Sequence, residues 1–316
     1  MRTARFPDSG NRSDPVLVIG HGLIGARVRS MLVARGVPVA VVARRPWTAS
    51  HCHALDLSAE QGLRALRSML ETLRPLCVVL CHGPSNVSWI EEHEAEAAVA
   101  HSGVAALIAQ SDLRAVLVST DNVFSGTRGR YRPRDATRPS NAYGRVKAQA
   151  EDLLLAGGAA LVLRASLVYG WSDSRHRENF AERCLRAAFD HRRFVAPTDQ
   201  WSAPLHADDV ARVVVGACTA LRFPTAIRHL AGPDELSRFD FARLAYRLAA
   251  AEPDLVQPCL RRDTEWASRP GYSSLECSDF ADLAGLADWR PMGPEAGLKE
   301  MLADVDGRAR RFEGAQ

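Results

Sequence analysis

The sequence predicts an α/β protein built on a Rossmann-type, doubly wound parallel sheet, with a smaller and mostly helical C-terminal region. Three observations lead to this prediction. Short apolar strands alternate with amphipathic helices from residue 15 to about residue 170, as parallel βαβ units require. The glycine motif G-x-G-x-x-G lies between the first strand and the first helix. A later apolar strand ends in Ser119 and Thr120, at the sheet edge where such folds bind ligands.

Strands and helices follow one another in a regular order. Apolar β-branched runs indicate strands at residues 15–20, 37–46, 76–83, 113–120, 159–166 and 227–232. Helical spacing of apolar residues indicates helices at residues 21–36, 58–75, 91–111, 140–158, 206–221 and 237–251. The alternation weakens beyond residue 170. We therefore expect a dinucleotide-binding domain at 15–170 and a mainly substrate-binding region at 171–316, with some segments of the latter returning to the sheet.

The composition is that of an ordinary globular protein, with a net charge of +3 that is too small to argue for a nucleic-acid partner. No apolar run is long enough to cross a membrane, and residues 1–14 lack the apolar core of a signal peptide. We expect a disordered leader at 1–14 and a cytoplasmic protein. The seven cysteines are odd in number and spread singly, which favours reduced thiols. His51, Cys52 and His53 crowd together but cannot close a tetrahedral site alone, so no metal is expected.

The glycine loop at residues 20–25 predicts a dinucleotide-binding site. Gly20 allows the tight turn, Gly22 lets the backbone approach a pyrophosphate, and Gly25 lets the helix pack on the strand. Leu23 and Ile24 complete the loop at the helix N-terminus, which faces the anion. Glycines that serve only helix packing are the alternative interpretation.

Two arginines follow the second strand and bear on the choice of cofactor. An NAD site would carry an acidic residue there for the ribose hydroxyls, whereas this chain has Arg44 and Arg45. Two guanidinium groups suit a 2′-phosphate, which favours NADP(H) over NAD(H); two ordinary surface arginines are the alternative.

One of the few lysines of this chain stands next to a tyrosine. Of 40 basic residues, only Lys147 and Lys299 are lysines, and Lys147 follows Tyr143 by four positions on one helical face. A nearby ammonium favours the phenolate, so we expect Lys147 to lower the pKa of Tyr143. Thr120, at the strand end opposite, would hydrogen-bond a reacting carbonyl oxygen. A lysine placed by chance on a solvated helix is the alternative.

In this order and spacing the motifs resemble those of the extended short-chain dehydrogenase/reductases, most of all the dTDP-4-dehydrorhamnose reductase family. The resemblance runs from about residue 16 to 303 and includes segments 54–57, 119–126, 163–170, 199–211, 229–235 and 273–285. It implies that Tyr143 is the general acid, that Lys147 lowers its pKa and binds the cofactor ribose, and that Thr120 positions the substrate oxygen. It also implies a homodimer and cofactor contacts from Asp56, Leu57, Cys81, His82 and Gly83.

The chain departs from the family pattern in several places. The family has an aromatic residue at Asn122 and a tryptophan at Leu167, on the side that faces the sugar, and its glycine loop is one residue longer. His101 stands where the family commonly has an asparagine that assists a water relay; a relay role and a structural role both remain open. The residues expected to contact substrate are Asp121, Asn122, Leu167, Gln200 and Trp201.

The leading hypothesis is therefore an NADP(H)-dependent reductase that transfers hydride to a ketone. Nucleotide-activated 4-keto-deoxysugars are the substrate class that the resemblance implies, with a related small ketone as a variant. One rival is a non-catalytic, NADP-binding regulatory subunit, since the β subunit of methionine adenosyltransferase is similar to these reductases. Another is an epimerase or dehydratase of the same superfamily; a dehydratase is disfavoured because Asp121 is not followed by a second acid.

Overall fold

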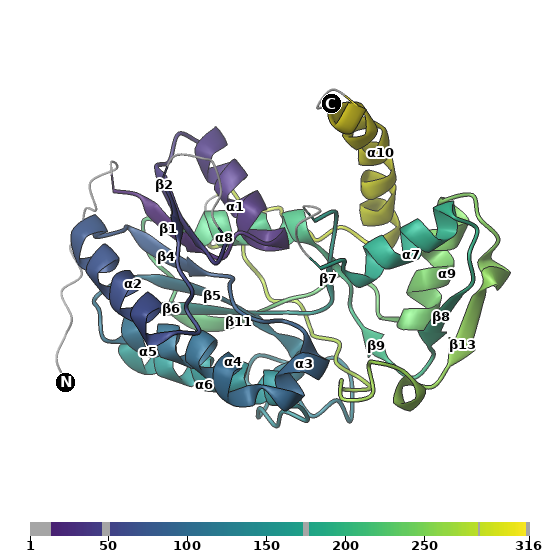
Figure 1. Ribbon diagram of the computed structural model, residues 1–316, viewed down its shortest axis with the longest axis horizontal. Coiled ribbons are helices and arrows are strands. Elements are labelled where there is room, and N and C mark those ends of the chain that lie inside the picture. Colours follow the sequence, from purple (N-terminus) through teal and green to yellow (C-terminus); the bar gives the residue numbers. More distant parts are fainter. Residues whose placement is uncertain (1–13, 46–50, 173–176, 284, 314–316) are drawn as a thin grey trace.

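A computed structural model describes residues 14–45, 51–172, 177–283 and 285–313, with side chains described up to residue 304. The chain forms a large lobe around one sheet and a small lobe made mainly from its C-terminal half (Figure 1). The leader expected at 1–14 lies almost entirely outside the described residues. Within the described part, no helix has both the length and the apolar character needed to span a bilayer.

The large lobe is organised by a seven-stranded parallel sheet with the strand order β11-β6-β5-β4-β1-β2-β3. The order reverses at β1, so the adjoining βα loops open a crevice at the carboxyl ends of the strands. The fold class predicted from the sequence is confirmed. The strands are β1 (Val16–Ile19), β2 (Val39–Ala43), β3 (Cys52–Ala54), β4 (Cys77–Leu80), β5 (Ala115–Thr120), β6 (Ala160–Ala165) and β11 (Ala226–Leu230).

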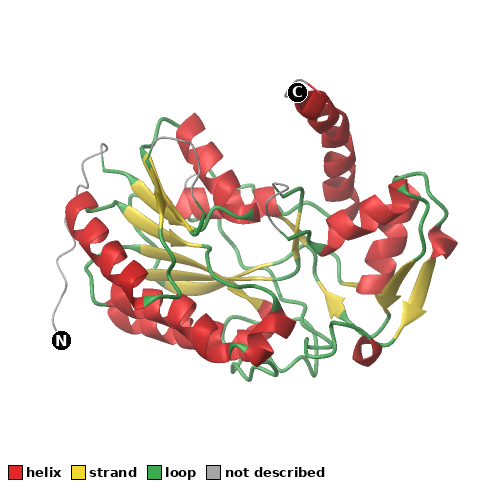
Figure 2. Cartoon of the chain, viewed as in Figure 1, coloured by secondary structure: helices red, strands yellow, loops and turns green. Residues whose placement is uncertain are grey.

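Helices cover both faces of this sheet (Figure 2). The central strands have apolar side chains on both sides, as strands buried between two helical layers require. One face packs against α1 (Leu23–Ala34) and α8 (Ala207–Cys218), and the other against α2 (Glu60–Leu73), α5 (Val104–Ala109) and α6 (Ala142–Gly157). Because α8 and β11 come from beyond residue 200, the sheet and its covering layer draw on both halves of the chain.

The small lobe packs three helices around an aromatic core that includes Phe180, Phe241, Tyr246 and Trp266. Its helices are α7 (Phe180–Phe189), α9 (Arg238–Leu248) and α10 (Pro294–Glu313). Short two-stranded pairs, β10-β7, β12-β9 and β13-β8, brace these helices and the connection to the large lobe. Their strands are β7 (Val168–Tyr169), β8 (Phe194–Pro197), β9 (Trp201–Ser202), β10 (Leu205–His206), β12 (Leu236–Ser237) and β13 (Val256–Cys259).

The helix expected at residues 91–111 is not continuous. It consists of α3 (Val87–Glu92), α4 (Glu94–Ala98), a π-helical turn (Val99–Gly103) and α5. His93 leaves the helical region with φ −131° and breaks the first two pieces apart. The π turn carries His101 into the interior, where its side chain is 4% exposed. Such turns are frequent at functional sites.

Candidate active site

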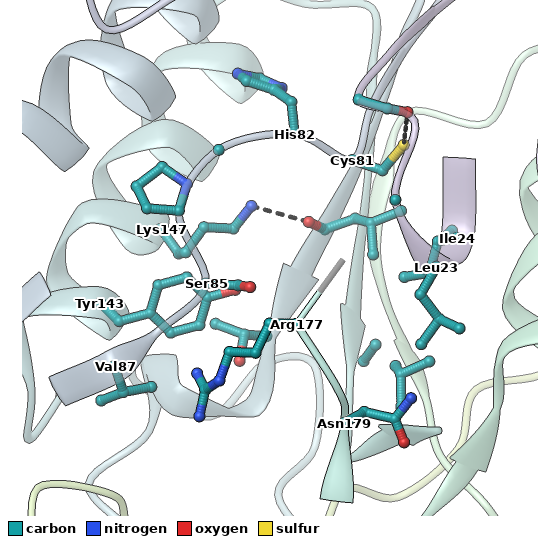
Figure 3. Close-up of a pocket in the computed structure, with 18 of the residues that line it drawn as sticks. Leu23, Ile24, Cys81, His82, Ser85, Val87, Tyr143, Lys147, Arg177 and Asn179 are labelled. Atoms are coloured by element: carbon teal, nitrogen blue, oxygen red, sulfur yellow. Dashed lines mark hydrogen bonds between the residues drawn. The ribbon is translucent and has the colours of Figure 1, made fainter. Parts of the chain in front are cut away.

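One pocket of about 810 Å³ runs from the glycine loop, past the carboxyl ends of β4 and β5, to the small lobe. Figure 3 shows Tyr143 and Lys147 on one wall, with Leu23 and Ile24 across from them. The pocket therefore brings together the glycine loop, the tyrosine–lysine pair and Thr120, which the sequence placed in three separate segments.

Helix α6, which carries Tyr143 and Lys147, is fixed to the sheet by buried polar contacts. The Asn141 side chain caps the helix by accepting a hydrogen bond from the Gly144 amide at 2.8 Å. On the same helix, the buried Glu151 carboxylate pairs with Arg164 of β6 at 2.7 Å and accepts a hydrogen bond from Ser119 of β5. Breaking such a buried pair would leave an uncompensated charge, so these contacts hold the helix in one register against β5 and β6.

The phenol of Tyr143 is in its protonated form at neutral pH. Burial is the main cause that raises its pKa to about 12, and the carboxylate of Asp121 acts in the same direction. Arg269 and a hydrogen bond with Thr120 lower it. The sequence assigned this lowering to Lys147, but the cation that acts on the phenol in the structure is Arg269. The phenol carries the proton that a general acid donates, although a pKa of about 12 makes it a weaker acid than an ordinary tyrosine.

Lys147 points its ammonium at the backbone instead. Its Nζ donates a hydrogen bond to the Val118 carbonyl oxygen at 2.9 Å, and the side chain is 3% exposed. Burial lowers the pKa of Lys147 to about 8, while Glu151 and Cys81 raise it. The group therefore can give up and take back a proton close to neutral pH, which an arginine cannot do.

Asn122 has a role that the sequence did not indicate. Its side-chain amide donates to the Thr120 hydroxyl at 3.1 Å and to the Asp121 carboxylate at 2.9 Å. Its side-chain oxygen accepts from Asn141, the cap of α6, at 2.9 Å. Asn122 lines the pocket, but its side-chain hydrogen bonds connect the end of β5 to the start of α6. It therefore keeps Thr120 and Tyr143 in a fixed relation to each other.

The glycine loop has the shape that a dinucleotide needs. Gly20 has φ +101°, a conformation that favours glycine, and a Cβ on Gly25 would lie 1.9 Å from the Gly20 carbonyl oxygen. A Cβ on Gly22 would meet open space, so this part of the backbone faces the pocket freely. The loop thus packs tightly on the inside and leaves its outer face open to a pyrophosphate.

The residues expected near the adenosine lie around the same end of the pocket. Arg44, Arg45, Asp56, Leu57, Cys81, His82 and Gly83 all line it. Arg44 and Arg45 are exposed, and the charge of Arg44 helps to lower the pKa of Asp56 after the hydrogen bonds from Ser58. The two arginines are therefore free to meet a phosphate at the pocket mouth.

Two histidines lie behind the cofactor end of the pocket, with ring centroids 5.7 Å apart. His82 donates from Nε2 to the Ala100 oxygen at 2.8 Å, and His101 donates from Nε2 to the Pro84 oxygen at 3.0 Å. Burial lowers the pKa of His82 to about 4 and holds that of His101 well below its ordinary value, so both rings are neutral. The His82 Nδ1 is buried with no hydrogen-bond partner among the described residues, which leaves an acceptor for a ligand.

The expected substrate residues do not all reach the pocket. Leu167 and Gln200 line it, whereas Trp201 does not, since successive side chains of an extended segment point to opposite sides. Sequence reasoning missed the small-lobe wall, formed by Arg177, Phe180, Arg183, Arg238, Trp266 and Arg269. No sequence motif marks these positions, and isolated arginines in a sequence are ordinarily interpreted as surface residues.

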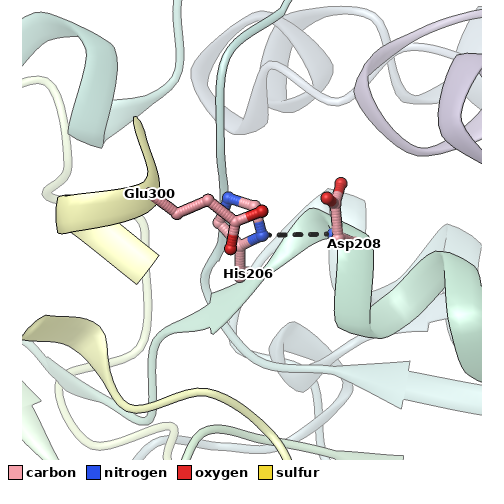
Figure 4. A group of neighbouring side chains, drawn as sticks. All are labelled: His206, Asp208 and Glu300. Atoms are coloured by element: carbon pink, nitrogen blue, oxygen red, sulfur yellow. Dashed lines mark hydrogen bonds between the residues drawn. The ribbon is translucent and has the colours of Figure 1, made fainter. Parts of the chain in front are cut away.

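A cluster of possible metal ligands lies outside this pocket, between α8 and α10 (Figure 4). His206, Asp208 and Glu300 each offer an atom within 4.8 Å of the others. Arg27 already places a guanidinium nitrogen 2.5 Å from the Asp208 carboxylate. Arg27 thus already neutralises the Asp208 carboxylate, which a bound metal cation would need as a negatively charged ligand.

A Rossmann sheet with a glycine loop, together with Tyr143 and the buried Lys147 in one pocket at its carboxyl edge, defines an NAD(P)-dependent oxidoreductase. The chain belongs to the family described as the RmlD substrate binding domain, whose model matches residues 15–306.

Individual relatives agree with this assignment. The dTDP-4-keto-6-deoxy-D-glucose reductase of Streptomyces niveus is 29% identical over 78% of this chain and 82% of its own. The β subunit of methionine adenosyltransferase 2 from Bos taurus is 26% identical over 75% of this chain and 73% of its own. The fold matches the dTDP-4-dehydrorhamnose reductase of Bacillus anthracis in complex with NADP. That match has a TM-score of 0.78 and 20% identity, and covers 92% of this chain and 99% of the other.

Proposed function

We propose that this protein is an NADP(H)-dependent reductase of a nucleotide-activated 4-keto-6-deoxysugar, with Tyr143 as the general acid. The observation that carries the proposal is that Tyr143 and Lys147 line one pocket together with the glycine loop and Thr120. The relatives' names support the substrate class, and Arg44 and Arg45 support NADPH over NADH. A homodimer stays a prediction.

The reaction follows from what the pocket holds. The glycine loop, Arg44 and Arg45 would hold the dinucleotide, and Lys147 would meet its ribose. When bound, NADPH supplies a hydride to the carbonyl carbon. The Tyr143 O–H gives its proton to the carbonyl oxygen as negative charge develops there, which completes a secondary alcohol. Lys147, with a pKa of about 8, can return a proton towards the phenolate.

Steady-state NADPH oxidation with dTDP-4-keto-6-deoxyglucose tests this proposal. Tyr143→Phe should bind NADPH with nearly the parent Kd but lose about 10²- to 10⁴-fold in rate, the usual contribution of general acid catalysis. Lys147→Arg should also lose activity, since a planar guanidinium neither fits nor exchanges its proton. Lys299→Arg is the matched control, because Lys299 is exposed and pairs with Glu295. If Lys147→Arg oxidises NADPH at the parent rate, Lys147 has only a structural role.

A second ketone tests which 4-keto-6-deoxysugars the protein accepts. Asn122 and Leu167 stand where the family has aromatic residues, and Asn122 is occupied with Thr120 and Asn141. We therefore expect poor turnover of dTDP-4-keto-rhamnose despite good NADPH binding. Efficient turnover would show that aromatic contacts at these positions are not needed.

A regulatory, non-catalytic subunit is the second candidate, and similarity to the methionine adenosyltransferase β subunit favours it. It predicts NADPH binding without oxidation by any ketone. If the protein is an epimerase, it should interconvert sugars with no net change in NADPH. An absorbance assay of NADPH, combined with analysis of the sugar products, therefore separates the reductase, the regulatory subunit and the epimerase.

A further inference from the structure

Arg238 is a buried cation that forms no ion pair with the residues that the structure describes. It is the first residue of α9, its side chain is 5% exposed, and it lines the small-lobe end of the pocket. Its Nε is buried without a hydrogen-bond partner, and within the described residues its guanidinium makes no ion pair. Buried arginines are ordinarily paired, because an unpaired buried charge is costly.

The surroundings of Arg238 hold it in place without neutralising it. Its Cζ lies 4.4 Å from the centre of the Phe180 ring and 5.8 Å from that of Trp266. Burial and the neighbouring charge of Arg269 lower the pKa of Arg238 to about 9. The start of a helix is also the end where the dipole disfavours a cation. The two rings and the charge of Asp121 favour the cation, but none of them forms an ion pair with it, and burial, Arg269 and the helix dipole act against the charge. This imbalance indicates a role in binding.

The nearby polar groups leave room for a ligand. Asp121 attracts Arg238, but its carboxylate is occupied by Ser273 at 2.7 Å and by Asn122 at 2.9 Å. The backbone carbonyl oxygen of Gln200 accepts a hydrogen bond from the backbone N–H of Arg238 at 2.9 Å. Its side-chain Oε1 is buried with no partner in the described part of the chain. An unused donor and an unused acceptor thus lie on adjoining segments of one pocket.

We propose that Arg238 binds an oxyanion of the substrate, and that Gln200 accepts a hydrogen bond from a hydroxyl beside it. This rests on the proposed function and deepens it, since it makes Arg238 a specificity-determining residue at the small-lobe end of the pocket. The oxyanion belongs either to the diphosphate of a nucleotide or to a carboxylate on the sugar. Both present the paired oxygens that a guanidinium binds in a bidentate manner.

Calorimetric titration of the NADPH-loaded protein distinguishes these two sources. The probes are dTDP against thymidine, which differ in the diphosphate, and UDP-glucuronate against UDP-glucose, which differ in the carboxylate. The variant is Arg238→Met, which keeps a long apolar stem against Phe180 and Trp266. Arg243→Met is the matched control, since Arg243 lies on the same helix over an aromatic ring but is exposed.

The two sources give different results. If the diphosphate is bound, Arg238→Met weakens dTDP by about 10- to 100-fold, the usual worth of a hydrogen bond to a charged group, and leaves thymidine unchanged. If the carboxylate is bound, the parent prefers UDP-glucuronate and the variant loses this preference. Because the substitution removes an unpaired buried charge, we expect a thermal midpoint at or above that of the parent. Unchanged affinities for all four probes, or no binding of any anion by the parent, would overturn the proposal.

Turnover separates this proposal from the proposed function. If the parent reduces a dTDP-ketosugar and Arg238→Met does so with the same KM, the reductase assignment stands and the oxyanion site fails. If the parent oxidises no NADPH but binds dTDP or UDP-glucuronate through Arg238, the oxyanion site stands and the reductase assignment fails.

Discussion

Replacing Lys147 by Met should change how the stability of the cofactor-free protein depends on pH. The pKa of Lys147 is about 8 in the folded state against an ordinary 10.5, so between these values the unfolded chain binds more protons. Stability must then rise with pH across this window, because deprotonation removes a charge that is costly to bury. The shift corresponds to about 3 kcal/mol at neutral pH, of which about 1 kcal/mol is recovered between pH 7 and 9.

Urea unfolding at pH 7, 8 and 9 measures this contribution. The parent should gain about 1 kcal/mol of unfolding free energy over this range relative to Lys147→Met. Every other titratable group is present in both proteins, so the difference between the two pH profiles reports on Lys147. Lys299→Met should behave as the parent does, since Lys299 is exposed. Parallel pH profiles for parent and Lys147→Met would refute the view that Lys147 is buried with its charge.

Two further predictions concern the cofactor end of the pocket. Replacing both Arg44 and Arg45 by Ala should weaken NADPH binding while leaving NADH binding nearly unchanged; equal affinities of the parent for both cofactors would contradict the 2′-phosphate role. Gly25→Ala should weaken NADPH binding and lower the thermal midpoint, because the added methyl overlaps a backbone oxygen at 1.9 Å. Gly22→Ala, which meets open space, should leave the midpoint nearly unchanged, and a scanning calorimeter compares the two variants.

Sequence patterns predicted the lining of the glycine-loop end of the pocket better than that of the small-lobe end. The glycine loop and the spacing of Tyr143 and Lys147 are local features, so the elements that carry them follow from periodicity alone. The π turn that buries His101 could not be predicted, because it depends on how one helix packs against its neighbours. Trp201 was placed in the pocket although Gln200 and Ser202 line it, since the orientation of a two-residue strand cannot be read from composition.

Electrostatics depended even more on the tertiary structure. The expectation that Lys147 governs the phenol of Tyr143 came from helical spacing, which brings the side chains to one face without fixing where their tips point. In the structure the ammonium turns to Val118, and Arg269, more than one hundred residues further along, acts on the phenol. Arg238 was overlooked for a similar reason, because only packing reveals that it is buried and forms no ion pair among the described residues.

The return of β11 to the sheet has a consequence for how the protein can be assembled or divided. β11 pairs with β6 along its whole length, and α8 packs on α1 from the first segment of the chain. A fragment ending near residue 170 would carry the glycine loop, Tyr143 and Lys147, yet it would present β6 as a bare and largely apolar edge open to aggregation. During synthesis the sheet of the dinucleotide half can therefore be completed only after β11, which begins at Ala226, has been made. We expect neither half to be obtained as a soluble, independent piece.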